Sequence, residues 1–271
     1  MKILFLGVFS PRSTNVSQYQ ALERIGCEVF AVDFRENHVT PSGLAAQCKA
    51  WNPDLVLFSK CNELDHEVMD VCGGARTVYW YMDPVNGNWA PAVEKMKRAD
   101  VVYCNIWDAY EAAKEFCNAH HLHEGFDPLV DRLRMQDHFY DVTFMGGLHG
   151  NRAEYADCFE HLTGRYGDDH ARAVAASKIN LNFTNGGASD RVYKIMAAGG
   201  FLLTEYWPHM EDDFWQGDDL ATFEGKEDLI EKIAYYLKYE DERKTIAANG
   251  YLKVQKFNRT AWAKRIAEDA I

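Results

Sequence analysis

Three consecutive residues, Ser189, Asp190 and Arg191, are of the types that bind a phosphate group at the beginning of a helix. Serine or aspartate can cap the helix, and the amides of its first turn have no partners within the helix, so they attract an anion. The guanidinium of Arg191 adds a full positive charge beside them. The alternative is an ordinary β-α-β unit whose glycines only serve tight turns.

The elements that must hold these residues follow from the surrounding pattern. Residues 179–183 and 201–204 are short apolar runs, which are typical of buried strands. A glycine-rich loop over residues 185–188 leads from the first strand into the helix, and Gly199 with Gly200 leads from the helix into the second strand. A strand, a glycine loop and a helix that begins with an arginine together predict a phosphate-binding unit.

A resemblance to a known family rests on this part of the chain. The C-terminal half of CgeB-like glycosyltransferases, which are relatives of the GT-B enzymes, resembles the segment SDRVYKIMAAGGFLLTEY, with ASKINLNFT before it and DLIEKIAYYLKYEDERKTIAANG after it. The resemblance extends upstream to YDVTFMGGLHGNRAEY and, more weakly, to the N-terminal half. It therefore covers roughly half the chain with specific motifs and the rest by architecture.

The resemblance implies a sugar-nucleotide site on the second half of the chain. In the family, the helix beginning at Ser189 forms a wall of that site, with Arg191 facing the donor diphosphate, and the turn GGLHGNR comes close to the donor. For that turn, a simple glycine turn with a solvated arginine is the alternative. The expected donor-binding residues are Gly146, Gly147, Arg152, Ser189, Asp190, Arg191, Lys194 and Gly200.

Two positions depart from the family pattern. Many of the related enzymes carry a pair of glutamates, the second of which contacts the donor ribose, where this sequence has Gly186 and Lys194. The chain between Arg152 and Lys178 also has room for only two short helices and a vestigial strand at residues 164–167, so we expect a trimmed second domain. Both features favour a second hypothesis, a non-catalytic relative that binds a sugar nucleotide or a carbohydrate.

The first half of the chain alternates predicted strands with helices, which indicates a parallel, doubly wound sheet. Asp33 ends the second strand, where nicotinamide-binding folds place an acid, but the loop GVFSPRS lacks the required GxGxxG pattern, which argues against a dehydrogenase. We expect an α/β protein with two Rossmann-like domains that face each other across a cleft, as in GT-B enzymes. The acceptor-side domain would span residues 1–133 and the nucleotide-sugar-binding domain residues 134–271.

Asp83 is the first candidate for a catalytic base. It follows the buried run RTVYWYM, and Pro84 stops the strand there, so the carboxylate lies at the carboxyl end of the sheet. A carboxylate partly shielded by Trp80 and Trp89 would suit the removal of a proton from an acceptor hydroxyl. Glu63, at the end of the preceding strand, is the competing candidate. The alternative for Asp83 is a turn residue that accepts bonds from nearby amides.

Composition limits the function classes. The chain has 271 residues, 47% of them hydrophobic, and a formal charge of −12, which argues against a surface that coats nucleic acid or anionic membranes. Seven scattered cysteines without CxxC spacing and the absence of a long apolar run predict a cytoplasmic protein with no membrane span. Neither the acids around Asp212 and Asp218 nor the histidines around His121 show metal-ligand spacing, so we expect no metal and no cofactor.

The sequence therefore predicts a metal-independent glycosyltransferase that moves a sugar from a nucleoside-diphosphate sugar to an acceptor hydroxyl. The acceptor is unknown, and a carbohydrate, a protein or a modified nucleic-acid base would all qualify. A transferase that acts on an extruded base would need a cationic track and aromatic stacking groups.

Overall fold

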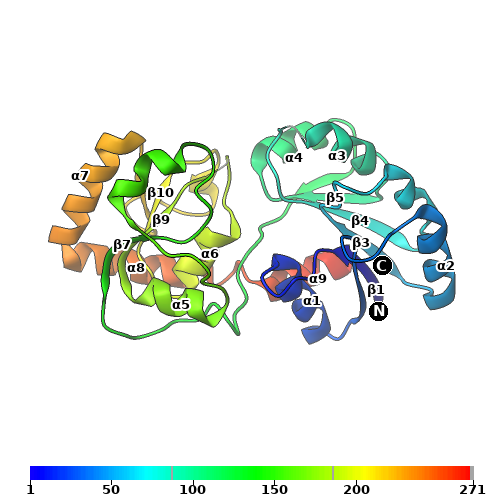
Figure 1. Ribbon diagram of the computed structural model, residues 1–271, viewed down its shortest axis with the longest axis horizontal. Helices are drawn as coiled ribbons and strands as arrows, with labels where there is room; N and C mark the ends of the chain where they lie inside the picture. The colour runs from blue at the N-terminus through cyan, green and yellow to red at the C-terminus, as the bar shows by residue number, and fades with distance from the viewer. Residues whose placement is uncertain (87, 185, 269–271) are drawn as a thin grey trace. The chain divides into compact units, whose positions relative to one another are not determined.

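The computed structural model describes residues 1–86, 88–184 and 186–268, and the chain forms two compact α/β units (Figure 1). The first unit comprises Met1–Glu124 together with Arg259–Ile271, and the second comprises Gly125–Asn258. Each unit is built on its own parallel sheet with helices on both faces.

The sheet of the first unit has the strand order β2-β1-β3-β4-β5-β6, and the strands are parallel. In this order β2 lies on one side of β1 and β3 lies on the other. After β2 the chain therefore crosses back over β1, and each later strand is added on the β3 side. The strands are β1 (Lys2–Gly7), β2 (Glu28–Asp33), β3 (Leu55–Ser59), β4 (Arg76–Tyr81), β5 (Val101–Cys104) and β6 (Ala119–His121).

Alternate residues of these strands face two different cores, because successive side chains of a strand point to opposite faces. Leu55, Leu57 and Trp80 face a core that α1 and α9 cover, whereas Val56 and Phe58 face a core covered by α2, α3, α4 and a 3₁₀ helix. The helices are α1 (Thr14–Arg24), α2 (Pro41–Trp51), α3 (Trp89–Met96), α4 (Trp107–Ala113) and α9 (Arg259–Glu268), with the 3₁₀ helix at His66–Val71.

The last helix corrects the expected division of the chain. We expected a boundary near Leu133 and a C-terminal helix in the second domain, but the chain leaves the first unit at Glu124 and α9 returns to it (Figure 1). Trp262 and Ile266 of α9 are fully buried in the core of the first unit, beside α1. The amphipathic pattern predicts such a helix correctly, but it carries no information about which of two similar sheets the apolar face will cover.

The second unit has a five-stranded parallel sheet in the order β11-β10-β9-β7-β8. Its strands are β7 (Tyr140–Phe144), β8 (Glu160–His161), β9 (Ser177–Asn182), β10 (Leu202–Glu205) and β11 (Ala221–Phe223). Its helices are α5 (Asp168–Ala175), α6 (Asp190–Ala197), α7 (Gly225–Lys238) and α8 (Glu240–Val254), with 3₁₀ helices at Gly150–Cys158 and Met210–Asp212. The vestigial strand expected at residues 164–167 was wrong, because the short edge strand is β8.

The central strand β9 carries an unusual polar face. Ile179 and Leu181 pack into the core beneath α7 and α8, while the alternating Asn180 and Asn182 are fully buried on the other side. The amide of Asn182 donates to Thr204 Oγ1 on β10 at 2.9 Å, so this buried polar side chain is bonded within the sheet. The pattern INLN thus places hydrogen-bonding groups under α5 and α6, next to the site described below.

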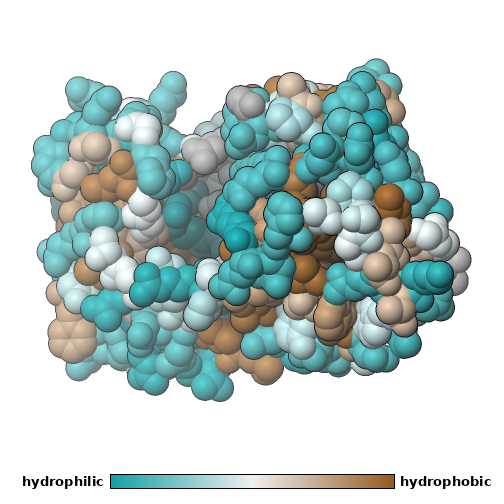
Figure 2. Space-filling model, turned by 45° about the vertical axis from the view of Figure 1, so that its right-hand side comes forward, coloured by the Kyte–Doolittle hydropathy of each residue, from teal (hydrophilic) through white to brown (hydrophobic). Residues whose placement is uncertain are grey.

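The outer surface agrees with the charged composition. The face shown in Figure 2 is mostly hydrophilic, and its apolar side chains form scattered patches. No helix in the described part of the chain is long and apolar enough to cross a membrane.

Candidate functional site

Arg191 joins three elements at the carboxyl edge of the second sheet. From the first turn of α6, its Nε donates to the carbonyl of Met145 at 2.7 Å and its Nη1 donates to Asn182 Oδ1 at 3.0 Å. The guanidinium also lies 5.0 Å from the centre of the Phe144 ring. The arginine is therefore held rigidly where β7 and β9 end, which is the edge at which parallel α/β sheets bind ligands.

Gly146 is required by this arrangement. A Cβ atom at this position would lie 2.4 Å from Arg191 Nη2 and 3.0 Å from its Cζ, so any larger residue would displace the guanidinium. A Cβ at Gly147 would lie 2.2 Å from His149 Nε2 instead. Gly146 and Gly147 thus have different roles, and of these two only Gly146 makes room for Arg191.

Arg152 is turned inward rather than toward a ligand. Its Nη1 donates to the carbonyl of Gly147 at 3.2 Å and its Nη2 donates to the carbonyl of Phe183 at 3.3 Å. The side chain is buried, and this burial lowers the pKa of the guanidinium, although the nearby carboxylate of Glu205 opposes the change. Arg152 therefore ties the β7 loop to the end of β9, and a direct bond to a donor stays a prediction.

Glu205 was missed by the reading of the sequence. It is the last residue of β10, it accepts a hydrogen bond from the Thr184 amide at 2.9 Å, and the side chain of Asn151 also bonds to it. Burial raises the pKa of its carboxyl group, and Arg152 acts in the opposite direction. An acid at the end of a buried strand is the signal that could have identified it.

The glycine-rich loop before α6 is closed on itself. Thr184 Oγ1 accepts from the amides of Gly186 at 3.1 Å and Gly187 at 2.9 Å, and it donates to the Gly187 carbonyl at 2.7 Å. These two amides are therefore already bonded, so the remaining donors for an anion are those of the first turn of α6. Asn185, which belongs to the expected loop, lies outside the described residues.

The first turn of α6 differs from the expected cap. Ser189 occupies the N-cap position, but its side chain makes no capping bond, and its Oγ is enclosed without a partner among the described residues. Asp190 is the first residue of the helix itself, and it forms an ion pair with Lys194 at 2.5 Å. The Lys194 ammonium is thus bound to a carboxylate at the place where the sequence predicts a donor contact.

Gly200 lies apart from the other expected donor-binding residues. It precedes β10 at the amino edge of the sheet, whereas Ser189, Arg191 and Gly146 lie at the carboxyl edge. A Cβ there would lie 2.4 Å from Val174 Cγ1 of α5, so the glycine permits close packing of the turn on α5. The structure gives Gly200 a packing role and brings the other residues together without it.

In the first unit, Asp83 and Lys60 come together from the ends of neighbouring strands. Lys60 Nζ lies 2.7 Å from Asp83 Oδ1, and the side chain of Asp83 is 21% exposed. Lys60 and Cys61 both have positive φ angles, 59° and 49°, and the Tyr79 hydroxyl donates to the Lys60 carbonyl at 2.5 Å. Such conformations cost free energy in residues other than glycine and gather at functional sites. Lys60 was missed, although a lysine directly after a buried strand is a signal in the sequence.

Of the two tryptophans expected beside Asp83, Trp80 lies on the opposite face of the sheet. Trp80 is fully buried and its ring packs against Trp262 of α9 at 5.9 Å, so the expectation that it shields Asp83 was wrong. The reason is strand alternation, which turns Trp80 to the face opposite Tyr79 and Tyr81. Trp89 packs against Tyr81 at 5.7 Å.

Glu63 is held at the surface by Arg35. Its carboxylate accepts from Arg35 Nη2 at 2.7 Å and from Nε at 3.1 and 3.2 Å, and both side chains are more than half exposed. A carboxylate held in a two-point ion pair in water is poorly suited to removing a proton. Geometry therefore favours Asp83 over Glu63 as the candidate base.

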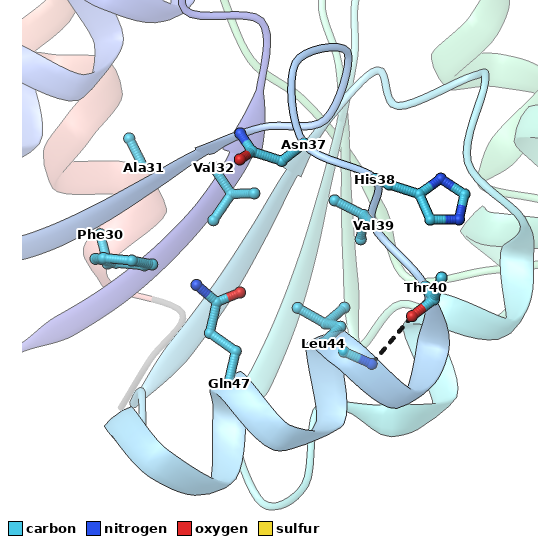
Figure 3. Close-up of a pocket in the computed structure, with 10 residues that line it drawn as sticks. Phe30, Ala31, Val32, Asn37, His38, Val39, Thr40, Leu44 and Gln47 are labelled. Atoms are coloured by element: carbon cyan, nitrogen blue, oxygen red, sulfur yellow. Dashed lines mark hydrogen bonds between the residues drawn. The ribbon is translucent and has the colours of Figure 1, made fainter.

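Two further features of the first unit bear on ligand binding, the histidines around His121 and a hollow beside β2. Within the described residues, no three His, Cys, Asp or Glu side chains are placed to share a metal ion, and His121 instead stacks on Trp107 with ring centres 4.0 Å apart. A hollow of about 280 Å³ lies between β2 and α2, bounded by Phe30, Val32, Leu44 and Gln47 (Figure 3). None of the residues expected from the sequence to bind or to catalyse lines this hollow.

Comparisons with solved structures show the same architecture over the whole chain. HepE from Anabaena, in complex with UDP-glucose, has a TM-score of 0.73 at 14% identity and covers 99% of this chain and 98% of its own. Sucrose-phosphate synthase from Thermosynechococcus elongatus has a TM-score of 0.76 at 9% identity, with 99% and 98% covered. The β-glucosyltransferase of phage T4 has a TM-score of 0.69 at 10% identity, with 100% and 99% covered.

These similarities establish the fold, which is that of the GT-B glycosyltransferases with two parallel-sheet α/β domains. The comparison with curated proteins found no significant match. A family model described as glycosyl transferase-like matches residues 126–268, which is more than half of the chain and includes β7, β9, α6 and the Arg191 site. On this match, the chain belongs to the glycosyl transferase-like family.

Proposed function

We propose that the protein transfers a hexose from a nucleoside-diphosphate sugar to an acceptor hydroxyl and needs no metal ion. The observation that carries this proposal is the fixed guanidinium of Arg191, which lies at the carboxyl edge of the sheet within the family-matched segment. The UDP-glucose bound by HepE supports a nucleotide sugar as the donor. All seven cysteines are free, which suits a reducing compartment, so we expect a cytoplasmic enzyme.

The chemistry requires a positive field for the leaving group. In the transfer, the bond between the anomeric carbon and the diphosphate oxygen breaks, and a bond to the acceptor oxygen forms. The nucleoside diphosphate leaves with the electron pair of the broken bond, and the acceptor proton passes to a base. Amides at the beginning of α6 and the charge of Arg191 would stabilise the diphosphate as its negative charge grows.

Asp83 is the base that we propose for the acceptor hydroxyl. It lies at the carboxyl edge of its own sheet, and Lys60 holds one carboxylate oxygen in a fixed place. A base must be held in one orientation to reach a hydroxyl proton, and a single charged partner provides that while the other oxygen can still accept. Glu63 is the second candidate.

The test is a panel of nucleoside-diphosphate sugars with nucleotide release measured in the presence and absence of candidate acceptors. We expect at least one donor to be consumed at the same rate with and without a chelator. Loss of activity in the chelator that Mn²⁺ or Mg²⁺ restores would refute the metal-independent mechanism. Arg191→Ala should weaken binding of the nucleoside diphosphate by about 2 kcal/mol in calorimetry, the size of a charge-assisted phosphate contact. Unchanged affinity would place the donor elsewhere.

Two alternatives rest on particular observations. Gly186 and Lys194 stand in place of the glutamates of many relatives, and Lys194 is bound to Asp190, which favours a protein that binds a sugar nucleotide without catalysing transfer. Binding without turnover of any donor would support it. The likeness to the DNA-modifying phage enzyme favours a modified nucleic-acid base as acceptor. A gel shift that weakens with salt, seen with DNA whose modified bases carry a hydroxyl group, and incorporation of the sugar into that DNA, would support this acceptor.

A further inference from the structure

His161 is an exposed residue at the carboxyl edge of the second sheet that the proposed reaction has not yet used. It is the last residue of β8, and in the sheet it pairs with Phe144, the last residue of β7. Its Nε2 atom lies 2.7 Å from the carbonyl oxygen of Gly146. Because a carbonyl oxygen only accepts hydrogen bonds, Nε2 must carry a proton and donate it to this bond. His161 therefore holds the residue that makes room for Arg191.

This bond continues the sheet beyond the end of β7. Strand β7 lies between β9 and β8, and the carbonyls of successive residues in a strand point to opposite neighbours. The Phe144 carbonyl accepts from a backbone amide that directly follows β8, at 3.0 Å. The next carbonyl, that of Met145, accepts from Arg191 Nε at 2.7 Å. The carbonyl after it, that of Gly146, accepts from His161. Two side chains thus take the places of backbone amides on the two sides of the turn.

The ring of Phe144 supports both of these side chains. The His161 ring lies at 20° to it with ring centres 6.0 Å apart, and the Arg191 guanidinium lies 5.0 Å from its centre. Phe144 is fully buried, so its ring is held by close packing. A Cβ at Gly146 would lie 2.4 Å from Arg191 Nη2, so the backbone of this glycine lies directly against the guanidinium. The position of the Gly146 peptide therefore decides where the guanidinium can rest.

We propose that His161 is a positioning residue of the donor site, which holds the Gly146 peptide on the β8 side so that Arg191 keeps the place in which it binds the diphosphate. This inference rests on the proposed function, because Arg191 is the residue through which His161 acts. The imidazole contributes a directed hydrogen bond to the protein backbone and not a charge to the substrate. A side chain that keeps the hydrogen bond without the charge should therefore replace it.

The experiment compares variants that keep or remove the donor group. Glutamine places an amide N–H close to the position of Nε2, whereas phenylalanine keeps a ring on Phe144 and has no donor. Because His161 is exposed, neither change should prevent folding. The wild type is titrated with UDP, GDP, ADP and dTDP in a calorimeter, and each variant is titrated with the tightest of these.

We expect His161→Phe to weaken diphosphate binding about fivefold and His161→Gln to stay within about twofold of the wild type. Equal losses in the two variants would overturn the inference, because the hydrogen bond would then not be what matters. His138→Phe is the matched control, since His138 is also exposed and precedes the other end of β7. It should bind like the wild type.

A double-mutant cycle tests whether His161 acts through Arg191. In the Arg191→Ala background the guanidinium to be positioned is absent, so adding His161→Phe should change diphosphate affinity by less than about twofold. A full fivefold loss in that background would show an effect that does not pass through Arg191, and would overturn the inference while the donor site stands.

A measurement without ligand separates this inference from the proposed function, which fails if the wild type binds none of the four diphosphates. The Arg191 Nε–H group, which donates to the Met145 carbonyl, is observed by proton–nitrogen NMR. We expect its exchange with water to be about fivefold faster in His161→Phe than in the wild type, and unchanged in His138→Phe. Equal exchange rates in His161→Phe and the wild type would overturn the inference, whether or not a diphosphate binds.

Discussion

Acidification should destabilise the protein through His170, and the size of the effect follows from its burial. The pKa of the imidazole is lowered from 6.5 to about 3 in the folded protein, chiefly by desolvation. Protonation therefore favours the unfolded chain, so the stability from a neutral His170 is present above pH 6.5 and is lost as pH falls from 6.5 toward 3. At pH 5 the loss from this one residue amounts to about 2 kcal/mol.

The matched variant for this measurement is His170→Gln, which is polar but does not titrate. The free energy of unfolding is measured by urea denaturation at several pH values from 8 to 5, for both proteins, and the difference between them is plotted. Other titrating groups, such as Asp213 with its pKa raised to about 6, act in both proteins and cancel. We expect the wild type to lose about 2 kcal/mol relative to the variant over this range. Parallel curves would show that His170 accepts a proton as readily when folded as when unfolded, and would refute the argument.

Three further predictions concern residues at the carboxyl edges of the two sheets. Gly146→Ala should push the Arg191 guanidinium off its partners and reduce nucleoside-diphosphate affinity by about tenfold or more in calorimetry, whereas unchanged affinity would show that this arginine need not be fixed. Asp83→Asn should lower turnover by about 10²-fold with donor affinity and melting temperature preserved, and Lys60→Met should lower turnover less; near-normal turnover of the first would move the role of base to Glu63. Glu205→Gln tests a carboxyl group whose pKa burial raises, so the wild type should gain stability relative to the variant as pH falls from 7 to 5, and a difference that does not change with pH would refute this.

The sequence predicted local structure well wherever a short apolar run ends in glycine, proline or a polar cluster. Asp33 was predicted to end the second strand, and β2 does end there, because the apolar run before it has no competing helical period. Strand β8 was misplaced because two exposed residues on a sheet edge have no apolar pattern.

The residue types of the candidate site could be predicted from the sequence, but the contacts between their side chains could not. The phosphate-binding unit at Arg191 follows from residue types and glycine spacing, and the structure does bring Arg191 and Gly146 together. The contacts of Lys60 with Asp83 and of Asn182 with Arg191 join residues from different strands and helices. These contacts depend on the order of the strands in the sheet, which no single segment of the sequence determines. The enclosed atoms of His170 and Ser189 could not be predicted either, since burial of a polar atom depends on the packing of two helices.

Because α9 packs on the first unit, the two units complete their cores at different times during synthesis. The second unit is one continuous segment, Gly125–Asn258, so all of its core exists once that segment has left the ribosome. The first unit must wait for residues that are made last, because until Trp262 and Ile266 arrive, Trp80 and its neighbours on one face of the sheet remain uncovered. A nascent or truncated chain that stops after Asn258 therefore exposes an apolar sheet face. We expect chaperones and proteases to bind such a chain at that exposed face.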